Sequence, residues 1–553
     1  MPRGTPHSVL NSLPEWQDNV NFALGRRDLI GEVDTTYSRF GIHPFVKQLT
    51  DVIIEASDRK HGGQYCLLFP TRMLAEECQS FIEAHVSPST SDVRSVTEIA
   101  QPPPPHQVFA VFFAAEQRAV MRFYTFSGGG ISTRLAELCL TNRAGLPPAL
   151  GIPPPAGHYY SEYYRRYSPL TSVSEAKAAI RFRFSGMIEG GANIRGVPGA
   201  SPDDVFPYAS GMQAIWRAYR LVSATIGAQK GSENLKVAHI NLIYTDSYKF
   251  PGLNTSSGYH FFADDGLDEL EALLERGTPS RPAILALYTD FPGNPHLRCA
   301  DLPRLRALAD RYNFPIIIDE TAGGYVNMQI LPYCDVVVSS ITKLFSGHAN
   351  VLGGALMLNP ASRFYAQFKT YMEATYEDSY FDNEALVMEL NSREVVSRTA
   401  IVNRNAEALA DMLHARAAQD NSVVAAVHYP KYRTRENYDR CRNPLAEQAG
   451  LASTGYGPLL AVTFKSLAAA KRFYSALRCY KGATLGTVFT LATAFTAIAV
   501  PPDEMQWAKD HGVEESLVRF SVGMEDTAAV LECVSNALDL TEQRETGSDR
   551  QLE

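Results

Sequence analysis

Apolar and polar positions alternate along the middle of the chain in a way that predicts a sheet covered by helices. Continuous apolar runs, such as Pro315–Ile318 and Val336–Val338, are typical of strands buried on both faces. Asp301 is a predicted N-cap at the start of a helical stretch between such runs. The apolar stripe of that stretch consists of Leu302, Leu305 and Leu308. The pattern predicts a large α/β domain over residues 156–390 with a mostly parallel sheet.

The flanking regions have different patterns. Residues 1–155 alternate short apolar runs with helical stretches, separated by clusters of proline and glycine, which predicts an N-terminal α+β extension. Its apolar runs are residues 65–69, 108–113 and 119–126. Residues 391–541 predict a smaller C-terminal α/β domain. The polar residues 542–553 are expected to form a disordered tail.

A lysine, Lys343, follows the apolar run Val336–Val338 after a short Ser/Thr stretch. A lysine in an enclosed site loses solvation, so its ammonium form is disfavoured and its amine can form a Schiff base. The hydroxyls of Ser340 and Thr342, with nearby main-chain N–H groups, are suited to a phosphate. This combination points to pyridoxal phosphate (PLP). Taken alone, a lysine after an apolar strand is more often a surface residue.

An aspartate, Asp319, ends the run Pro315–Ile318. The carboxyl end of a buried parallel strand is where open α/β sheets bind ligands. A carboxylate there can keep the pyridine nitrogen of PLP protonated, so that the ring acts as an electron sink. The alternative for Asp319 is a turn or helix cap after a strand. The two segments together favour the cofactor interpretation.

Five segments carry a family resemblance. SSITKLFSGHANVLGGA resembles the lysine segment of the cystathionine γ-synthase, γ-lyase and β-lyase group of PLP enzymes, of fold type I. Four more resemble that group's motifs in the same order: YASGMQAIWRAY (208–219), YTDSYKF (244–250), YTDFPGNPHLRCADLPRLRALA (288–309) and LVRFSVGMEDTAAVL (517–531). The N-terminal region and KGATLGTVFTLA (481–492) are most similar to the fungal cystathionine γ-synthase branch. The resemblance implies a PLP-dependent transferase fold of type I, with the predicted extension and smaller domain added to the central sheet.

The resemblance assigns roles at the cofactor. Ser210, Gly211 and Met212 match the turn that holds the phosphate, where free N–H groups start a helix. Tyr248 matches the tyrosine that stacks on the pyridine ring and assists proton transfer and departure of the leaving group. Asn294 matches the asparagine near the phenolic oxygen of the cofactor. Without the lysine segment, these positions would be an ordinary helix junction, an exposed strand end and a turn.

The resemblance also assigns a substrate site. Arg519 matches the arginine that binds the substrate α-carboxylate, a task suited to a planar, bidentate donor. Thr490 occupies the position of a residue that touches the same carboxylate. Phe489 stands where many relatives have an acidic residue in the distal pocket, and phenylalanine cannot pair with an ammonium group. This departure disfavours cystathionine cleavage and leaves room for a less polar nucleophile.

The segment EYYRRY (162–167) resembles an arm that donates a tyrosine and an arginine to the phosphate in the neighbouring subunit. Tyr164 and Arg166 are the matching pair, and Tyr163 with Arg165 is the alternative. The resemblance therefore implies a homodimer or homotetramer with shared active sites.

The implied reaction is a γ-replacement on an O-acyl-L-homoserine through a vinylglycine-type ketimine, with Lys343 as base, Asp319 against the ring and Tyr248 assisting the leaving group. Cysteine as nucleophile yields cystathionine. The alternative is a carbon nucleophile that forms a C–C bond, as in some fungal specialised-metabolite pathways. A third alternative is a non-catalytic regulator, which the presence of both Lys343 and Asp319 disfavours. The acyl group stays open.

Composition narrows the remaining classes. With 553 residues, 45% hydrophobic and 20% charged, the chain can bury a large core. A net charge of −9 argues against nucleic-acid binding. No apolar run reaches the roughly 18 residues of a membrane span, and the N-terminus lacks the apolar core of a secretory signal. Eight cysteines without a CxxC pair suit a reduced, cytoplasmic protein. The 13 histidines show no spacing of metal ligands, so no metal is expected.

Overall fold

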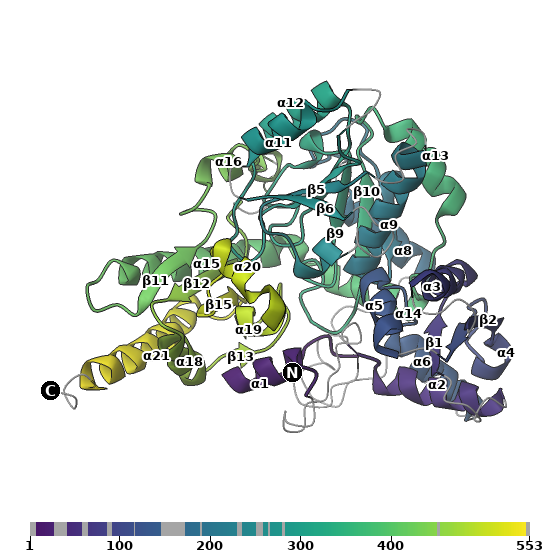
Figure 1. Cartoon of the computed structure of the whole chain (residues 1–553), viewed down its shortest axis with the longest axis horizontal. Helices are drawn as coiled ribbons and strands as arrows, with labels where there is room; N and C mark the ends of the chain where they lie inside the picture. The colour runs from purple at the N-terminus through teal and green to yellow at the C-terminus, as the bar shows by residue number, and fades with distance from the viewer. Residues whose placement is uncertain are drawn as a thin grey trace.

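Three sheets organise the chain (Figure 1). The computed structural model describes residues 7–26, 41–57, 65–85, 91–114, 117–144, 172–188, 191–228, 235–249, 258–263, 266–278, 283–448, 450 and 454–548. The central sheet holds the strand ends where the site is predicted. The other two sheets lie on either side of it in the sequence.

The N-terminal sheet has the order β1-β3-β2 and is antiparallel throughout. Its strands are β1 (Tyr65–Phe69), β2 (Ser91–Ser95) and β3 (Phe109–Phe113). The helices around it are α2 (Pro44–Ala56), α3 (Arg72–His85), α4 (Thr97–Ala100), α5 (Gln117–Ser127) and α6 (Thr133–Arg143). Strand β3 is buried on both faces, because α3 and α5 cover one side and α2 and α6 the other. The apolar run 119–126 belongs to helix α5.

The extension shares a core with the central domain. The rings of Phe123 in α5 and Trp216 in α9 (Gly211–Val222) meet edge to face at 5.9 Å. Glu77 in α3 accepts hydrogen bonds from Trp216 and Arg217 in the same helix. The N-terminal extension is therefore packed on the helix whose first turn is the predicted phosphate site.

The central sheet has the strand order β4-β10-β9-β8-β7-β5-β6. Its strands are β4 (Val205–Tyr208), β5 (Val237–Ile240), β6 (Tyr259–Phe262), β7 (Leu287–Asp290), β8 (Ile316–Asp319), β9 (Val336–Ser339) and β10 (Gly354–Leu358). Strand β10 runs antiparallel to both of its neighbours, and the five strands from β9 to β6 are parallel. The mostly parallel sheet predicted from the apolar runs is confirmed.

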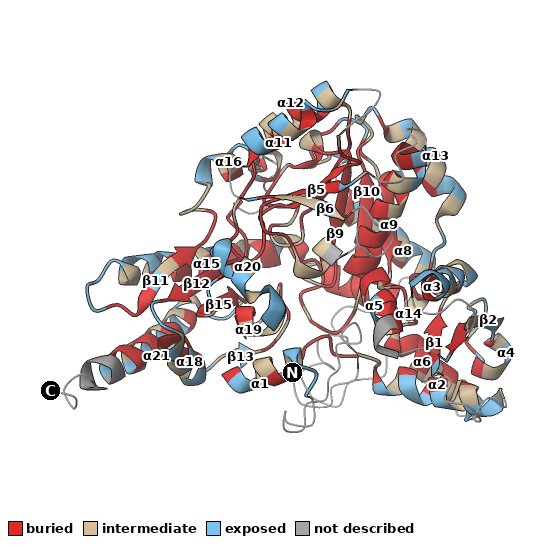
Figure 2. Cartoon of the chain, viewed as in Figure 1, coloured by how far each residue is buried: buried red, intermediate tan, exposed pale blue. Residues whose placement is uncertain are grey.

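Helices cover both faces of this sheet, which is buried between them (Figure 2). They are α8 (Val173–Phe184), α9, α11 (Leu267–Leu274), α12 (Leu302–Tyr312), α13 (Tyr365–Thr375) and α14 (Asp382–Ser392). Ile316 and Ile318 of β8 face the core that contains α11 and α12, and Ile317 faces the core that contains α9. The side chain of Asp301 accepts a hydrogen bond from the Arg304 N–H and caps α12, as predicted.

The C-terminal sheet has the order β11-β12-β15-β14-β13. Its strands are β11 (Val424–His428), β12 (Leu459–Phe464), β13 (Tyr480–Lys481), β14 (Leu491–Ala494) and β15 (Leu517–Ser521). The main helices here are α15 (Val395–Ala417), α18 (Leu467–Ala476), α19 (Phe495–Ala499), α20 (Met505–Asp510) and α21 (Thr527–Ser548).

The expectation of a disordered tail from residue 542 is wrong up to Ser548, because α21 continues to that residue. Thr541 and Glu542 are buried. The Glu542 carboxylate accepts hydrogen bonds from the Arg416 guanidinium in α15, and this long-range contact holds the helix beyond the last apolar positions.

The segment 7–13 connects all three parts of the chain. His7 contacts Thr133 in α6, the Val9 N–H donates to the Ala349 carbonyl at 2.8 Å, and the Leu13 N–H donates to the Lys481 carbonyl at 2.9 Å. Helix α1 (Trp16–Ala23) then packs against α18 and α19. The first described residues therefore belong to the core of the molecule.

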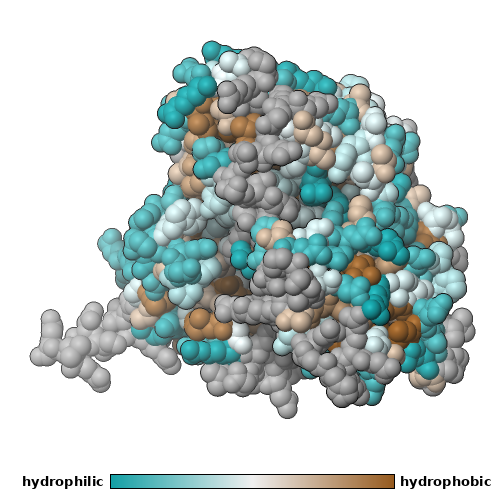
Figure 3. Space-filling view, turned by 45° about the vertical axis from the view of Figure 1, so that its right-hand side comes forward, coloured by the Kyte–Doolittle hydropathy of each residue, from teal (hydrophilic) through white to brown (hydrophobic). Residues whose placement is uncertain are grey.

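The face in Figure 3 is mostly hydrophilic, with hydrophobic residues in small separate patches. Within the described ranges, no helix is long and apolar enough to cross a membrane.

Candidate active site

The site lies at the carboxyl ends of the parallel strands β7, β8 and β9. Asp290 ends β7 and Asp319 ends β8, and the two are register partners on neighbouring strands. Lys343 follows the end of β9 within a tight turn. Sequence positions more than 50 residues apart thus meet where open α/β sheets bind ligands.

The turn around Lys343 is fixed from two sides. The hydroxyl of Thr342 donates to the Gly353 carbonyl at 3.1 Å and accepts from the Gly353 N–H at 2.9 Å. Arg398 in α15 is fully buried and donates to the carbonyls of Leu344 and Phe345, both at 2.9 Å. The Thr342 hydroxyl is engaged here in holding the loop. The predicted phosphate contact at Thr342 would require this hydroxyl to change partners.

The Lys343 Nζ donates to the Oγ1 of Thr484 at 2.8 Å. Thr484 is buried and begins the loop that precedes β14. The loop passes close to the lysine, since a Cβ at Gly486 would lie 2.4 Å from the Leu344 nitrogen. The C-terminal domain therefore supplies the residue that orients the amine.

Asp319 is buried, and its carboxylate accepts from the Thr321 N–H at 2.8 Å and from the Tyr288 hydroxyl at 3.4 Å. Burial raises the pKa of Asp319 to about 6, and its hydrogen bonds with Thr321 partly offset this effect. The Thr321 hydroxyl in turn accepts from the Ser340 N–H at 2.8 Å. The strand end that carries Asp319 is thus linked directly to the lysine segment.

The start of α9 faces the lysine segment. A Cβ at Gly211 would lie 2.5 Å from the Cβ of Ser340, so only glycine permits this approach. The Ser210 hydroxyl caps the helix by accepting from the Gln213 N–H at 3.1 Å, and it donates to the Gly128 carbonyl at 2.9 Å. The Met212 side chain is buried in the core. A phosphate would bind the main-chain N–H groups of the first helical turn, because these groups have no hydrogen-bond acceptor within the helix.

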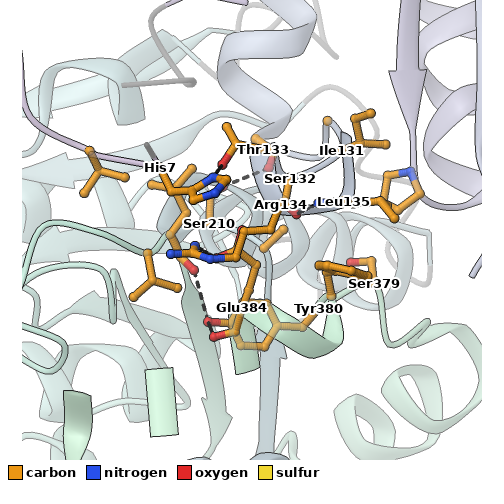
Figure 4. Close-up of a pocket in the computed structure, with 18 of the residues that line it drawn as sticks. His7, Ile131, Ser132, Thr133, Arg134, Leu135, Ser210, Ser379, Tyr380 and Glu384 are labelled. Carbon is orange, nitrogen blue, oxygen red and sulfur yellow. Dashed lines mark hydrogen bonds and ion pairs between the residues drawn. The ribbon is translucent and has the colours of Figure 1, made fainter. Parts of the chain in front are cut away.

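A pocket on the other side of Ser210 lies at the seam between the extension and the central domain (Figure 4). His7 contacts the Thr133 hydroxyl at 2.7 Å. The Arg134 guanidinium donates to Glu384 at 2.5 Å and to the Asn350 carbonyl at 2.8 Å. These buried contacts fasten α6 to the N-terminal segment, to α14 and to the loop that follows Lys343.

Arg519 is buried on β15 and points at the same place. It donates to the Asn294 Oδ1 at 3.1 Å and to the Thr484 carbonyl at 3.2 Å. Burial lowers the pKa of Arg519 to about 10. No carboxylate pairs with it among the described residues, so a buried cation is left to bind an anion.

Two tyrosines lie near the predicted ring position. The Tyr248 hydroxyl accepts from the Ile243 N–H at 2.8 Å, and its ring packs among other rings. Those rings belong to His239, Tyr259, Phe261 and Trp507. Tyr244 is half-buried, its N–H donates to Asp290 at 2.8 Å, and its charge interaction with Arg519 raises the pKa of that guanidinium. The Tyr244 hydroxyl donates to the Asp246 carboxylate at 3.0 Å, and of the two tyrosines it is Tyr244 whose charge interaction reaches Arg519.

The distal positions are held by contacts that the sequence did not reveal. Thr490 donates from its N–H and its hydroxyl to the two oxygens of Glu525, at 2.5 and 2.8 Å, so its side chain is directed at Glu525. Phe489 is half-buried against Val9 and Leu10 of the N-terminal segment. Its ring also lies 4.8 Å from that of Tyr480.

Tyr164 and Arg166, with the alternative pair Tyr163 and Arg165, lie outside the described residues. The sequence interpretation missed Thr484, Tyr244 and Glu525. The match of TLGTVFTLA to its family motif begins at Thr484, and that signal could have identified the lysine's partner.

Comparisons with known proteins agree with this geometry. Residues 204–539 match the family model described as Cys/Met metabolism PLP-dependent enzyme. Residues 45–132 match the model described as fungal trans-sulfuration enzyme, N-terminal domain. The two matches cover most of the central domain, nearly all of the C-terminal domain and more than half of the extension.

Curated relatives match nearly end to end. A cystathionine γ-synthase-like enzyme of Amanita muscaria, iboG1, is 37% identical over 97% of this chain and 96% of its own. A cystathionine γ-synthase of Neurospora crassa is 31% identical over 98% of each chain. Among solved structures, cystathionine γ-synthase of Xanthomonas oryzae in complex with cystathionine has a TM-score of 0.50 at 20% identity, over 68% of this chain and all of that one. That likeness shows the fold, and it confirms the predicted fold class.

The described residues fit PLP. A buried carboxylate, Asp319, is available for a ring nitrogen, and Lys343 supplies the amine. The glycine at position 211 leaves the first turn of α9 open towards Ser340, where a phosphate would bind. Arg519 and Asn294 complete the site with donors for a carboxylate.

Proposed function

The chain belongs to the Cys/Met metabolism family of PLP-dependent enzymes, and on that premise we propose that it catalyses a γ-replacement on an O-acyl-L-homoserine, with cysteine as nucleophile and cystathionine as product. One observation carries the proposal. Thr484 contacts both functional cations, because its hydroxyl accepts from Lys343 and its carbonyl accepts from Arg519. An amino acid whose carboxylate binds Arg519 would have its α-carbon beside the lysine amine.

The roles of the residues follow from this placement. Arg519 binds the α-carboxylate, and Asn294, whose Oδ1 accepts from the guanidinium, orients Arg519 for this task. Lys343 moves protons at the α- and β-carbons, and Thr484 holds its amine in position. When bound, PLP supplies an electron sink for the negative charge that develops on the substrate, and Asp319 maintains it by facing the ring nitrogen.

The tyrosine that assists departure of the acyl group is the second part of the proposal. We assign this role to Tyr244 in place of Tyr248. The Tyr248 hydroxyl accepts from the Ile243 N–H, whereas the half-buried Tyr244 donates its hydroxyl to Asp246 and interacts electrostatically with Arg519.

A second candidate function is γ-substitution by a carbon nucleophile such as the enolate of a small keto compound. The observation that favours it is the environment of Phe489, which packs against Val9, Leu10 and Tyr480. A wall of this kind suits a less polar nucleophile better than it suits the ammonium group of cysteine.

We further propose a cytoplasmic homo-oligomer, dimer or tetramer, in which the segment 162–167 of one subunit reaches the phosphate of the next. The family resemblance of that segment supports the proposal. Sedimentation and mixing of two inactive variants, Lys343→Ala and Arg166→Ala, test it. Recovery of activity in the mixture is expected if sites are shared, and no recovery would contradict sharing.

The test of the reaction is product analysis. The purified protein with PLP receives O-acetyl-, O-succinyl- or O-phospho-L-homoserine, together with cysteine, sulfide and a panel of keto compounds. Cystathionine as the dominant product in mass spectrometry supports the first function, and a carbon–carbon adduct with little cystathionine supports the second. Lys343→Ala should abolish either product, and Lys465→Ala, an exposed lysine, should not. If the PLP-loaded protein turned over no combination of homoserine ester and nucleophile, both candidate functions would be contradicted.

A further inference from the structure

Two of the eight cysteines differ from the rest. Six are buried: Cys66, Cys78, Cys139, Cys299, Cys334 and Cys441. Burial raises the pKa of Cys139 and Cys441 to about 12, so these thiols stay protonated and inert at neutral pH. Cys479 and Cys533 are both partly exposed. They are the thiols that reagents in solution can reach.

These two cysteines lie together although they belong to different elements. Cys479 immediately precedes β13, and Cys533 is in α21. Both line one open cavity of about 440 Å³, together with Tyr480, Thr490 and Glu525. The Cys479 thiol donates a hydrogen bond to the Cys533 sulfur. Two sulfur atoms in hydrogen-bonding contact are close to the separation from which a disulfide forms with small side-chain movements.

The two thiols, Cys479 and Cys533, differ in acidity. The hydrogen bond from Cys479, with one from the main chain of Arg478, lowers the pKa of Cys533, and the charge of Lys481 contributes in the same direction. Donating that hydrogen bond stabilises the protonated form of Cys479, and together with burial this raises the pKa of Cys479. Cys533 is therefore the thiol of the pair that ionises first, with the protonated Cys479 beside it. A thiolate next to a resolving thiol is the arrangement that exchanges with disulfides.

We propose that Cys479 and Cys533 are a redox modification site that forms a reversible intramolecular disulfide by exchange with a low-molecular-weight disulfide. The Cys533 thiolate attacks one sulfur of the reagent, R–S–S–R, and expels RS⁻. Cys479 then attacks the Cys533 sulfur of the mixed disulfide and expels the second RS⁻. One expelled RS⁻ takes the proton of Cys479 and the other takes a proton from water, so both end as thiols. The protein loses two electrons and the reagent gains two.

The bridge would join α21 to the wall of the active site. Tyr480 follows Cys479 directly and its ring lies 4.8 Å from that of Phe489. Glu525, which lines the same cavity, accepts hydrogen bonds from the N–H and the hydroxyl of Thr490. Cross-linking the two cysteines therefore restrains the segment that carries Phe489 and Thr490.

The experiment equilibrates the PLP-loaded, full-length protein with mixtures of reduced and oxidised glutathione, alkylates the remaining thiols and determines masses of the protein and its peptides. The wild type is expected to lose two alkylation sites and two hydrogen masses, with a cross-linked peptide that contains Cys479 and Cys533. Cys479→Ser is expected to trap glutathione on Cys533. Cys533→Ser is expected to react slowly, because Cys479 lacks a thiolate. Cys441→Ser serves as a matched control and should bridge like the wild type.

The proposal would be overturned if Cys479 and Cys533 were both still alkylated in the oxidised wild type, or if glutathione stayed attached to Cys533 of the wild type. Equal reactivity of the two serine variants would also overturn it. Retained PLP absorbance reports that each variant is folded. Bridging is also expected to raise the KM for the preferred nucleophile by about threefold, reversibly and only when both cysteines are present. An unchanged KM in fully bridged protein would overturn the link to the active-site wall.

Discussion

The amine of Lys343 donates to the Oγ1 of Thr484 at 2.8 Å, across 141 residues of sequence. The two residues come from different domains, so the orientation of the central amine depends on how the C-terminal domain packs on the strand ends. The same threonine accepts from Arg519 through its carbonyl. Thr484 is therefore the point at which the carboxylate-binding side and the proton-transfer side of the site are held together.

Replacing Thr484 by valine removes the acceptor for Lys343 and keeps the shape of the side chain. We expect kcat to fall by about 10- to 100-fold, because a general base that is not positioned loses much of its contribution. PLP content should not change, and Thr484→Ser should restore most of the rate. Stopped-flow and steady-state kinetics measure this. A valine variant as fast as the wild type would show that the contact does not orient the amine.

Replacing Arg519 by alanine removes the buried cation that has Asn294 and Thr484 as partners. Charge-assisted hydrogen bonds contribute about 1.5–3 kcal/mol, so we expect kcat/KM to fall by roughly 10- to 150-fold, mainly through KM. The cofactor spectrum should stay as in the wild type. Arg519→Lys keeps the charge and loses the bidentate geometry, so its kcat/KM should lie between those of the wild type and the alanine variant. Unchanged kinetics in the alanine variant would remove the carboxylate assignment.

Asp319 makes the stability of the cofactor-free protein depend on pH. Burial raises its pKa from 3.8 to about 6 in the folded chain. Between these values the folded state keeps a proton that the unfolded state has lost, so the free energy of unfolding falls as pH rises from about 4 to about 6. Burial also raises the pKa of the neighbouring Asp290, so we expect Asp319→Asn to weaken this decline, and the exposed Asp420→Asn to retain it in full. Melting curves across this window measure the effect, and parallel curves for wild type and Asp319→Asn would contradict it.

We expect removal of the hydroxyl to affect stability at Tyr248 and catalysis at Tyr244. Tyr248→Phe leaves the buried Ile243 N–H without its acceptor, which costs about 1–3 kcal/mol of stability, while most of the rate remains at moderate temperature. Tyr244→Phe should lower kcat and leave the melting temperature nearly unchanged. Unfolding by denaturant and initial rates on both variants decide the assignment. A large loss of rate in Tyr248→Phe alone would return the role to Tyr248.

The apolar runs were enough to predict the central sheet and the ends of β8 and β9, because burial on both faces is a local property of the sequence. Lys343 and Asp319 were identified for the same reason, since Asp319 directly follows such a run and Lys343 is separated from one by a short Ser/Thr stretch. The choice between Tyr244 and Tyr248 was not local. It depends on the short helix Thr245–Lys249, which directs Tyr248 into a cluster that includes Trp507.

Contacts across long stretches of sequence account for the other differences. Thr490 faces Glu525, 35 residues further along, and Thr484 faces Lys343 from another domain. The polar residues beyond Thr541 stay helical because Glu542 meets Arg416. From the sequence alone, a polar side chain of this kind is expected to face solvent or substrate. Only the structure shows the distant partner that it contacts.

Phe489 offers a direct test of nucleophile choice. Its ring packs against Val9, Leu10 and Tyr480, so glutamate at this position would place a carboxylate where many family members have an acidic residue. We expect Phe489→Glu to shift the ratio of cystathionine to carbon–carbon product towards cystathionine by roughly tenfold, the effect of about 1.4 kcal/mol. The variant should also be less stable, because part of an apolar contact is replaced by a charge. Phe489→Leu keeps the apolar character and should keep the wild-type ratio. Competition between cysteine and a keto compound, followed by mass spectrometry, measures both. Equal shifts in the two variants would mean that the size of the ring, and not the missing charge, selects the nucleophile.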